Sequence, residues 1–134
     1  MLENFNYSSR QIEKYFKAAT KDFIIARDAN LPEVSFKFAY DSLIKLAVTV
    51  CAKNRLRIKA RTGHHIILLQ KFSEFLKNPD IEIFGNKMRS KRNRDLYDGG
   101  IFIDSKEVKE YVSWLNNVVQ ETKDYLFASP KLFK

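Results

Sequence analysis

Apolar residues recur at intervals of three and four positions along five long segments of this chain, and that spacing constrains its fold more than any other feature. The first such run follows Ser8 and comprises Ile12, Tyr15, Phe16, Ala19, Phe23 and Ala26. The 134 residues include only four glycines and three prolines, few for the many turns of an all-β sandwich or barrel. The pattern therefore predicts an all-α protein.

Five helices are expected, at residues 9–29, 32–53, 62–77, 81–97 and 105–126. The connections between them are short, and short connections place amphipathic helices antiparallel to their neighbours. The helix at 32–53 carries apolar residues on more than one side, which is typical of a helix at the centre of a bundle. We therefore expect residues 1–134 to form a single domain, one up-and-down helical bundle.

Residues that cap helices support several of these boundaries. Ser8 and Gln11 have the spacing of a capping box at the start of the first helix. Asp80 is the expected N-cap of the fourth helix, and either Asp104 or Ser105 can cap the fifth.

The segment KNRLRIKAR, at residues 53–61, alternates cations with other residues. A period of two is typical of extended chain. Because a single isolated strand would find no partner elsewhere in this sequence, we expect a frayed helix end that continues into an extended loop. The loop should end at Thr62, the expected N-cap of the third helix.

The charge of the chain points to a polyanionic partner. Lysine and arginine number 24 against 16 acidic residues, so the net charge is +8. Nucleic acid is the simplest partner for such an excess, although a soluble protein with a basic isoelectric point is the plainer alternative.

Cys51 is the only cysteine, which excludes an intrachain disulfide and fits a reducing compartment. It stands in an apolar run, so we expect it in the core. The first ten residues lack the basic-then-apolar pattern of a signal peptide, and no window approaches the ~18 uninterrupted apolar residues of a membrane span. We therefore expect a soluble, cytoplasmic protein without membrane contact.

The fourth expected helix begins apolar and ends ionic. Its stripe of Ile81, Phe84 and Met88 continues by helical steps to Arg92 and Asp95, or to Lys91 and Asp95. Buried charge is costly unless it is paired or open to water or a partner. The helix therefore either emerges from the core there or lines a polar cleft, and Arg92 and Asp95 can pair with each other.

Five cations crowd the end of this helix, within residues 87–94: Lys87, Arg89, Lys91, Arg92 and Arg94. Arginine suits phosphate because its planar group donates two parallel hydrogen bonds. Asn93 and Tyr97 share one helical face, and a tyrosine ring can stack on a base. The pattern predicts a surface for single-stranded nucleic acid. Its candidate binding residues are Arg89, Arg92, Asn93, Arg94 and Tyr97.

His64 and His65 are the only histidines and begin the third expected helix. Adjacent helical residues point about 100° apart, and no cysteine or glutamate stands at zinc spacing from them, so no metal site is predicted. One histidine is expected to donate to a neighbouring helix in an ordinary packing role, and the other can face the same cleft as the arginines. The sequence shows no glycine-rich phosphate loop, nucleophile elbow or Ser/His/Asp pattern, and we expect no cofactor.

Three stretches together resemble the HEPN family of small helical bundles. They are FAYDSLIKLAVTV at 38–50, TGHHIILLQKF at 62–72 and MRSKRNRDLYDGG at 88–100. The resemblance covers most of the chain and implies a HEPN-like bundle that is typically a homodimer. Many members are RNA-cleaving toxins or defence proteins, and some pair with a nucleotidyltransferase antitoxin.

The family motif places a polar residue after an arginine and a histidine a few positions further on. Arg92 and Asn93 match the first two positions, but Tyr97, Asp98 and Gly99 occupy those where the histidine would fall. An unperturbed tyrosine titrates near ~10, so Tyr97 is a poor substitute in proton transfer near neutral pH.

The resemblance thus implies a module that binds RNA or a nucleotide-handling partner without the usual ribonuclease chemistry, and whether the protein is an enzyme stays open. Two alternatives also stay open: a metal-independent ribonuclease toxin and a structural dimeric interaction subunit. The candidate catalytic residues are Arg92, Tyr97, His64 and His65.

Overall fold

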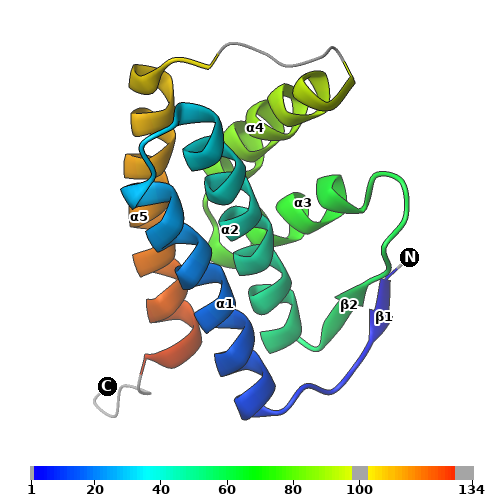
Figure 1. The fold of residues 1–134 in the computed structure, drawn as a ribbon. Coiled ribbons are helices and arrows are strands. Elements are labelled where there is room, and N and C mark those ends of the chain that lie inside the picture. Colours follow the sequence, from blue (N-terminus) through cyan, green and yellow to red (C-terminus); the bar gives the residue numbers. More distant parts are fainter. Residues whose placement is uncertain (1, 98–102, 129–134) are drawn as a thin grey trace.

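The computed structural model describes residues 2–97 and 103–128, and of residues 95–97 the backbone alone. This part of the chain is an all-α bundle of five helices with one small two-stranded sheet, which confirms the predicted fold class (Figure 1). The elements in chain order are β1 Leu2–Asn4, α1 Ser9–Asp28, α2 Pro32–Lys53, β2 Leu56–Ile58, α3 His64–Leu76, α4 Pro79–Tyr97 and α5 Ser105–Phe127.

Helix α2 is the centre of the bundle and contacts all four other helices. Helices α1 and α5 pack along it, whereas α3 and α4 lie beyond it and are inclined to the first three (Figure 1). Its residues Tyr40, Leu43, Leu46, Ala47 and Val50 are fully buried. The prediction of a central helix with more than one covered side is confirmed.

Two of the expected caps are present. The Ser8 Oγ atom accepts a hydrogen bond from the Gln11 amide at 3.1 Å, and the Gln11 side chain accepts one from the Ser8 amide at 2.9 Å. Asp104 Oδ1 accepts from the Glu107 amide at 2.7 Å. These bonds satisfy amides that the first helical turn leaves without partners.

The other two expected caps were wrong. Gly63, with φ of +83°, is the N-cap of α3 in place of Thr62, because a left-handed conformation that glycine adopts at little cost turns the chain into the helix. Helix α4 begins at Pro79, so Asp80 lies inside its first turn. Proline suits the first helical position because it needs no amide partner there, and Asn78 Oδ1 accepts from the Asp80 amide at 3.1 Å.

The expected loop after α2 contains a strand that the sequence analysis left without a partner. Leu56 to Ile58 pairs antiparallel with Leu2 to Asn4, with Glu3 opposite Arg57. Arg57 Nε donates to Glu3 Oε1 at 2.6 Å, and the Arg57 guanidinium lies 4.5 Å from the ring centre of Phe5. The alternating pattern of residues 53–61 was thus a strand signal, and its partner was too short to show a period of its own.

Two further observations bear on the environment of the protein. Cys51 is only 1% exposed and belongs to the core, as predicted. Among the helices of residues 2–97 and 103–128, none combines the length and the apolar character that crossing a bilayer requires.

Candidate functional site

Three helices bring together an aromatic ring, two histidines and two arginines. Tyr40 comes from α2, His64 and His65 from the first turn of α3, and Arg89 and Arg92 from the second half of α4. We call these five residues the Tyr40 cluster. The Tyr40 hydroxyl lies 2.8 Å from His65 Nδ1, and Arg92 Cζ lies 5.5 Å from the centre of the Tyr40 ring.

The ionic end of α4 reaches this cluster because it continues a buried face of the same helix. Ile81 and Met88 are fully buried, and Arg92 follows Met88 one turn later on the same side. The guanidinium therefore lies on the bundle side of α4, over the face of a buried ring, where a cation is attracted to the aromatic electrons.

A close contact between α3 and α4 holds the two sides of the cluster near each other. Gly85 of α4 faces Leu69 of α3, and a Cβ atom at Gly85 would lie 2.6 Å from Leu69 Cδ2. No side chain larger than hydrogen fits there without displacing Leu69. The glycine thus permits the short separation between the helix of the histidines and the helix of the arginines.

The Tyr40–His65 pair is neutral at physiological pH. Burial raises the pKa of Tyr40 to about 12, although Arg92 and Arg89 oppose the rise. Burial also lowers the pKa of His65 to about 4, and the positive potentials of His64, Arg92 and Arg89 lower it further. Asp41 acts in the opposite direction on the pKa of His65.

The burial of Tyr40 assigns the donor in the pair, because a buried O–H group without an acceptor is costly. The buried Tyr40 hydroxyl has His65 as its hydrogen-bond partner and donates to Nδ1, which carries the lone pair. The ring proton of His65 then lies on Nε2. His65 therefore presents a neutral N–H donor on the side of the ring that faces away from Tyr40.

His64 is oriented differently. Its Nδ1 atom lies 2.8 Å from the carbonyl oxygen of Arg61, and a carbonyl accepts, so Nδ1 carries the donated proton. In the neutral ring the Nε2 lone pair is then free to take up a proton. The two histidine rings lie 4.4 Å apart, so an acceptor and a donor of hydrogen bonds stand side by side.

Arg89, Arg92 and Asn93 share one face of α4, being spaced by three and four positions. All three side chains are half-buried. Arg89 Nε donates to Asn86 Oδ1 of the preceding turn at 3.1 Å, which orients its guanidinium. Two predicted nucleic-acid-binding arginines and the predicted amide thus lie on the side of α4 that carries the Tyr40 cluster.

The remaining cations of residues 87–94 lie on another side of α4. Lys91 Nζ is 2.7 Å from Glu107 Oε2 of α5. Arg94, predicted to share one surface with Arg92, lines a hollow together with Lys91, Glu107 and Tyr111. The sequence grouped these cations by their nearness along the chain, but a helix distributes consecutive residues around its axis.

Two predictions concern side chains outside the described part. Tyr97 is the last residue of α4, and its side chain, like that of Asp95, is not described. The stacking role of Tyr97 and the pairing of Arg92 with Asp95 therefore stay predictions.

Sequence reasoning missed Tyr40, the residue at the centre of the cluster. A signal was present, because Tyr40 lies among the apolar residues of the most buried helix, and a buried tyrosine needs a partner for its hydroxyl group. No specific contact was predicted for the adjacent histidines, His64 and His65, so either was a candidate partner for that hydroxyl group. His65 does contact a neighbouring helix, but toward Tyr40 it accepts the hydrogen bond that one histidine was predicted to donate.

Within the described residues, no three histidine, cysteine, aspartate or glutamate side chains gather closely enough to hold a metal ion. Comparison of the chain with protein-family models, with curated proteins and with solved structures found no match.

Proposed function

We propose that this chain is a HEPN-like module that binds RNA through the Tyr40 cluster and lacks the usual ribonuclease chemistry of that family. One observation carries the proposal. Arg92 lies over Tyr40 on the same side of α4 as Arg89, while Tyr40 holds the adjacent His65 as a neutral donor. Guanidinium groups and N–H groups are donors suited to the oxygens of a phosphodiester.

The electrostatics support an anionic ligand. The ion pairs among described side chains do not include Arg89 or Arg92, and both arginines are half-buried. A half-buried charge loses part of its hydration, and a bound phosphate compensates that loss. The net charge of +8 attracts a polyanion over longer distances, and we propose a cytoplasmic location together with the RNA ligand.

RNA binding measured against salt tests the proposal. The experiment compares wild type, the double variant Arg89→Gln/Arg92→Gln and a control, Lys17→Gln/Lys21→Gln, which removes two exposed charges from α1. The cluster variant should bind a single-stranded RNA about tenfold less tightly, and its salt slope should fall by about 1.4. An equal loss in both variants would reduce the effect to net charge and overturn the proposed site.

A second candidate function is a metal-independent ribonuclease, and the tautomer of His64 favours it. Its free Nε2 atom can take the proton from a 2′-hydroxyl group, whose oxygen then attacks the neighbouring phosphorus. The bond to the 5′ oxygen breaks, and that oxygen takes a proton from solvent. The products are a 2′,3′-cyclic phosphate and a 5′-hydroxyl end, with Arg92 stabilising the charge that develops.

Incubation of RNA with the protein and a chelator separates the two candidates. Binding without cleavage supports the module. Cleavage to a cyclic phosphate that His64→Gln abolishes, while RNA binding persists, supports the ribonuclease. Cleavage that persists in His64→Gln, His65→Gln and Arg92→Gln would come from another source.

The resemblance also implies partners. We propose a homodimer, with a nucleotide-handling protein such as a nucleotidyltransferase antitoxin as a possible further subunit. A purely structural interaction subunit, in which Arg92 bridges the dimer interface, differs in one measurable respect. Arg92→Gln should lower the solution mass of a structural subunit, whereas it should leave the mass of the RNA-binding module unchanged.

A further inference from the structure

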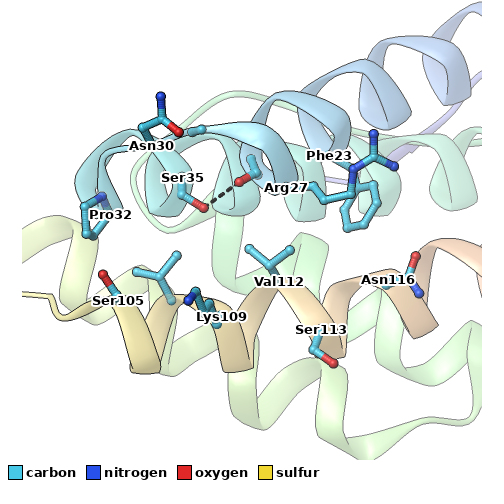
Figure 2. A pocket seen from close by; sticks show the side chains of 13 residues that line it. Phe23, Arg27, Asn30, Pro32, Ser35, Ser105, Lys109, Val112, Ser113 and Asn116 are labelled. Carbon is cyan, nitrogen blue, oxygen red and sulfur yellow. Dashed lines mark hydrogen bonds between the residues drawn. The ribbon is translucent and has the colours of Figure 1, made fainter.

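A separate site lies on the opposite side of the bundle from α3 and α4. It is a hollow of about 390 Å³ between the α1–α2 connection and the first half of α5 (Figure 2). None of the residues of the Tyr40 cluster lines it. Its volume lies within the range of roughly 300–1,000 Å³ that is usual for sites of small organic ligands.

The floor of the hollow is apolar. Phe23 and Ala26 of α1 and Val108 of α5 are buried, and Val112 projects from α5 toward the α1–α2 connection (Figure 2). The deepest hydroxyl, that of Ser35, donates to the Ala26 carbonyl at 2.6 Å, so its proton is engaged within the protein. The floor thus offers apolar area and little hydrogen bonding to a ligand.

The walls of the hollow are cationic. Arg27 of α1 and Lys109 of α5 stand on facing sides, and the lining includes no aspartate or glutamate among the described residues (Figure 2). Arg27 donates to both carboxylate oxygens of Asp28, at 2.9 and 3.1 Å, which offsets much of its charge. Lys109 takes part in none of the ion pairs between described side chains. The ammonium group of Lys109 is therefore the main charge available to a ligand.

We propose that this hollow binds a small organic carboxylate with an apolar body of about one or two rings. The body packs on Phe23 and Val112, and the carboxylate meets the ammonium group of Lys109. Asn30 and Asn116 also line the hollow, toward opposite ends of it (Figure 2). RNA is a poor fit here because the apolar floor has no donor for a phosphate. The site is independent of the function proposed for the Tyr40 cluster.

Calorimetric titration with 1-naphthoate, compared with the neutral 1-naphthalenemethanol, tests the proposal. The two probes share an aromatic body and differ in the anionic group. Naphthoate should bind wild type at least about tenfold more tightly than the alcohol does. Lys109→Gln should lower naphthoate affinity to that of the alcohol and leave alcohol binding unchanged.

Three further variants complete the test. Lys123→Gln, which removes an exposed charge further along α5, should leave naphthoate binding unchanged, and so should Arg92→Gln. Val112→Trp, which fills the hollow, should abolish binding of both probes. Equal affinity of wild type for the two probes, equal effects of Lys109→Gln and Lys123→Gln, or no binding at millimolar naphthoate would overturn the proposal.

Discussion

The hydroxyl group of Tyr40 lies 2.8 Å from Nδ1 of His65 and joins the central helix to the first turn of α3 across 25 positions of sequence. Burial keeps both side chains neutral, and the bond directs the Nε2–H of His65 away from the ring of Tyr40. Because Arg92 lies over that same ring, the bond also decides which donors stand beside the guanidinium group.

The stability of the protein should depend on the protonation of His65. Its pKa is lowered from 6.5 to about 4 on folding, so between these values the unfolded chain binds a proton that the folded protein does not. The neutral His65 side chain therefore makes its full contribution to the free energy of unfolding above pH 6.5, and this contribution is lost as the pH falls toward 4. Urea unfolding at several pH values should show a steeper loss for wild type than for His65→Gln, which cannot titrate at this position.

Nuclear magnetic resonance provides a direct check on the same group. The ring signals of His65 should remain those of the Nε2–H tautomer down to about pH 4. A midpoint near 6.5 in the folded protein would contradict both the burial of this ring and its bond to Tyr40.

Tyr40→Phe should lower the free energy of unfolding by about 1–3 kcal/mol, because it leaves a half-buried acceptor at His65 Nδ1 without a donor. The matched control is Tyr125→Phe. The Tyr125 hydroxyl accepts from Asn54 at 3.0 Å at an exposed position, so its loss should change stability by no more than about 0.5 kcal/mol. Equal effects of the two substitutions would contradict the buried hydrogen bond.

The effect of Gly85→Ala on the free energy of unfolding should change sign with the residue at position 69. In wild type the added Cβ meets Leu69, and the overpacking cost of about 1–3 kcal/mol should outweigh the gain of about 1 kcal/mol in helix propensity. In a Leu69→Ala background the obstacle is absent, so the same change should stabilise the protein by about 1 kcal/mol. Urea unfolding of the four proteins in this cycle measures the coupling. Additive effects would show that α3 and α4 do not press together at this point.

Arg92→Met should separate binding from stability. The long apolar side chain of methionine still covers Tyr40, so the free energy of unfolding should change by less than about 1 kcal/mol, the value of a partly exposed cation–π contact. RNA affinity should fall about tenfold. Met88→Ala, one turn earlier, should have the opposite effect. It should lower the free energy of unfolding by about 2–5 kcal/mol and leave RNA affinity unchanged. A large loss of stability in Arg92→Met would make this arginine a structural residue.

The helices could be predicted from the sequence because their signals are local. Periodic apolar residues and the capping box at Ser8 act within one or two turns, and they predicted the boundaries of α1 and α2 closely. The strand partner of β2 could not be predicted, because pairing of Leu2 with Ile58 depends on how two long helices return the chain. The apolar-to-ionic stripe of α4 left open whether its end emerges from the core or lines a cleft, and no spacing in the sequence links Arg92 to Tyr40.

The pairing of β1 with β2 determines which part of the protein opens first. Three residues on each side hold together two segments more than fifty positions apart, so this ladder has few bonds with which to resist separation. The amides of this ladder should exchange with deuterium long before those of α2. Each opening of the ladder should also free residues 59–63, the segment that connects β2 to His64 at the start of α3. The position of this imidazole would then fluctuate on its own timescale, while the five-helix core stays closed.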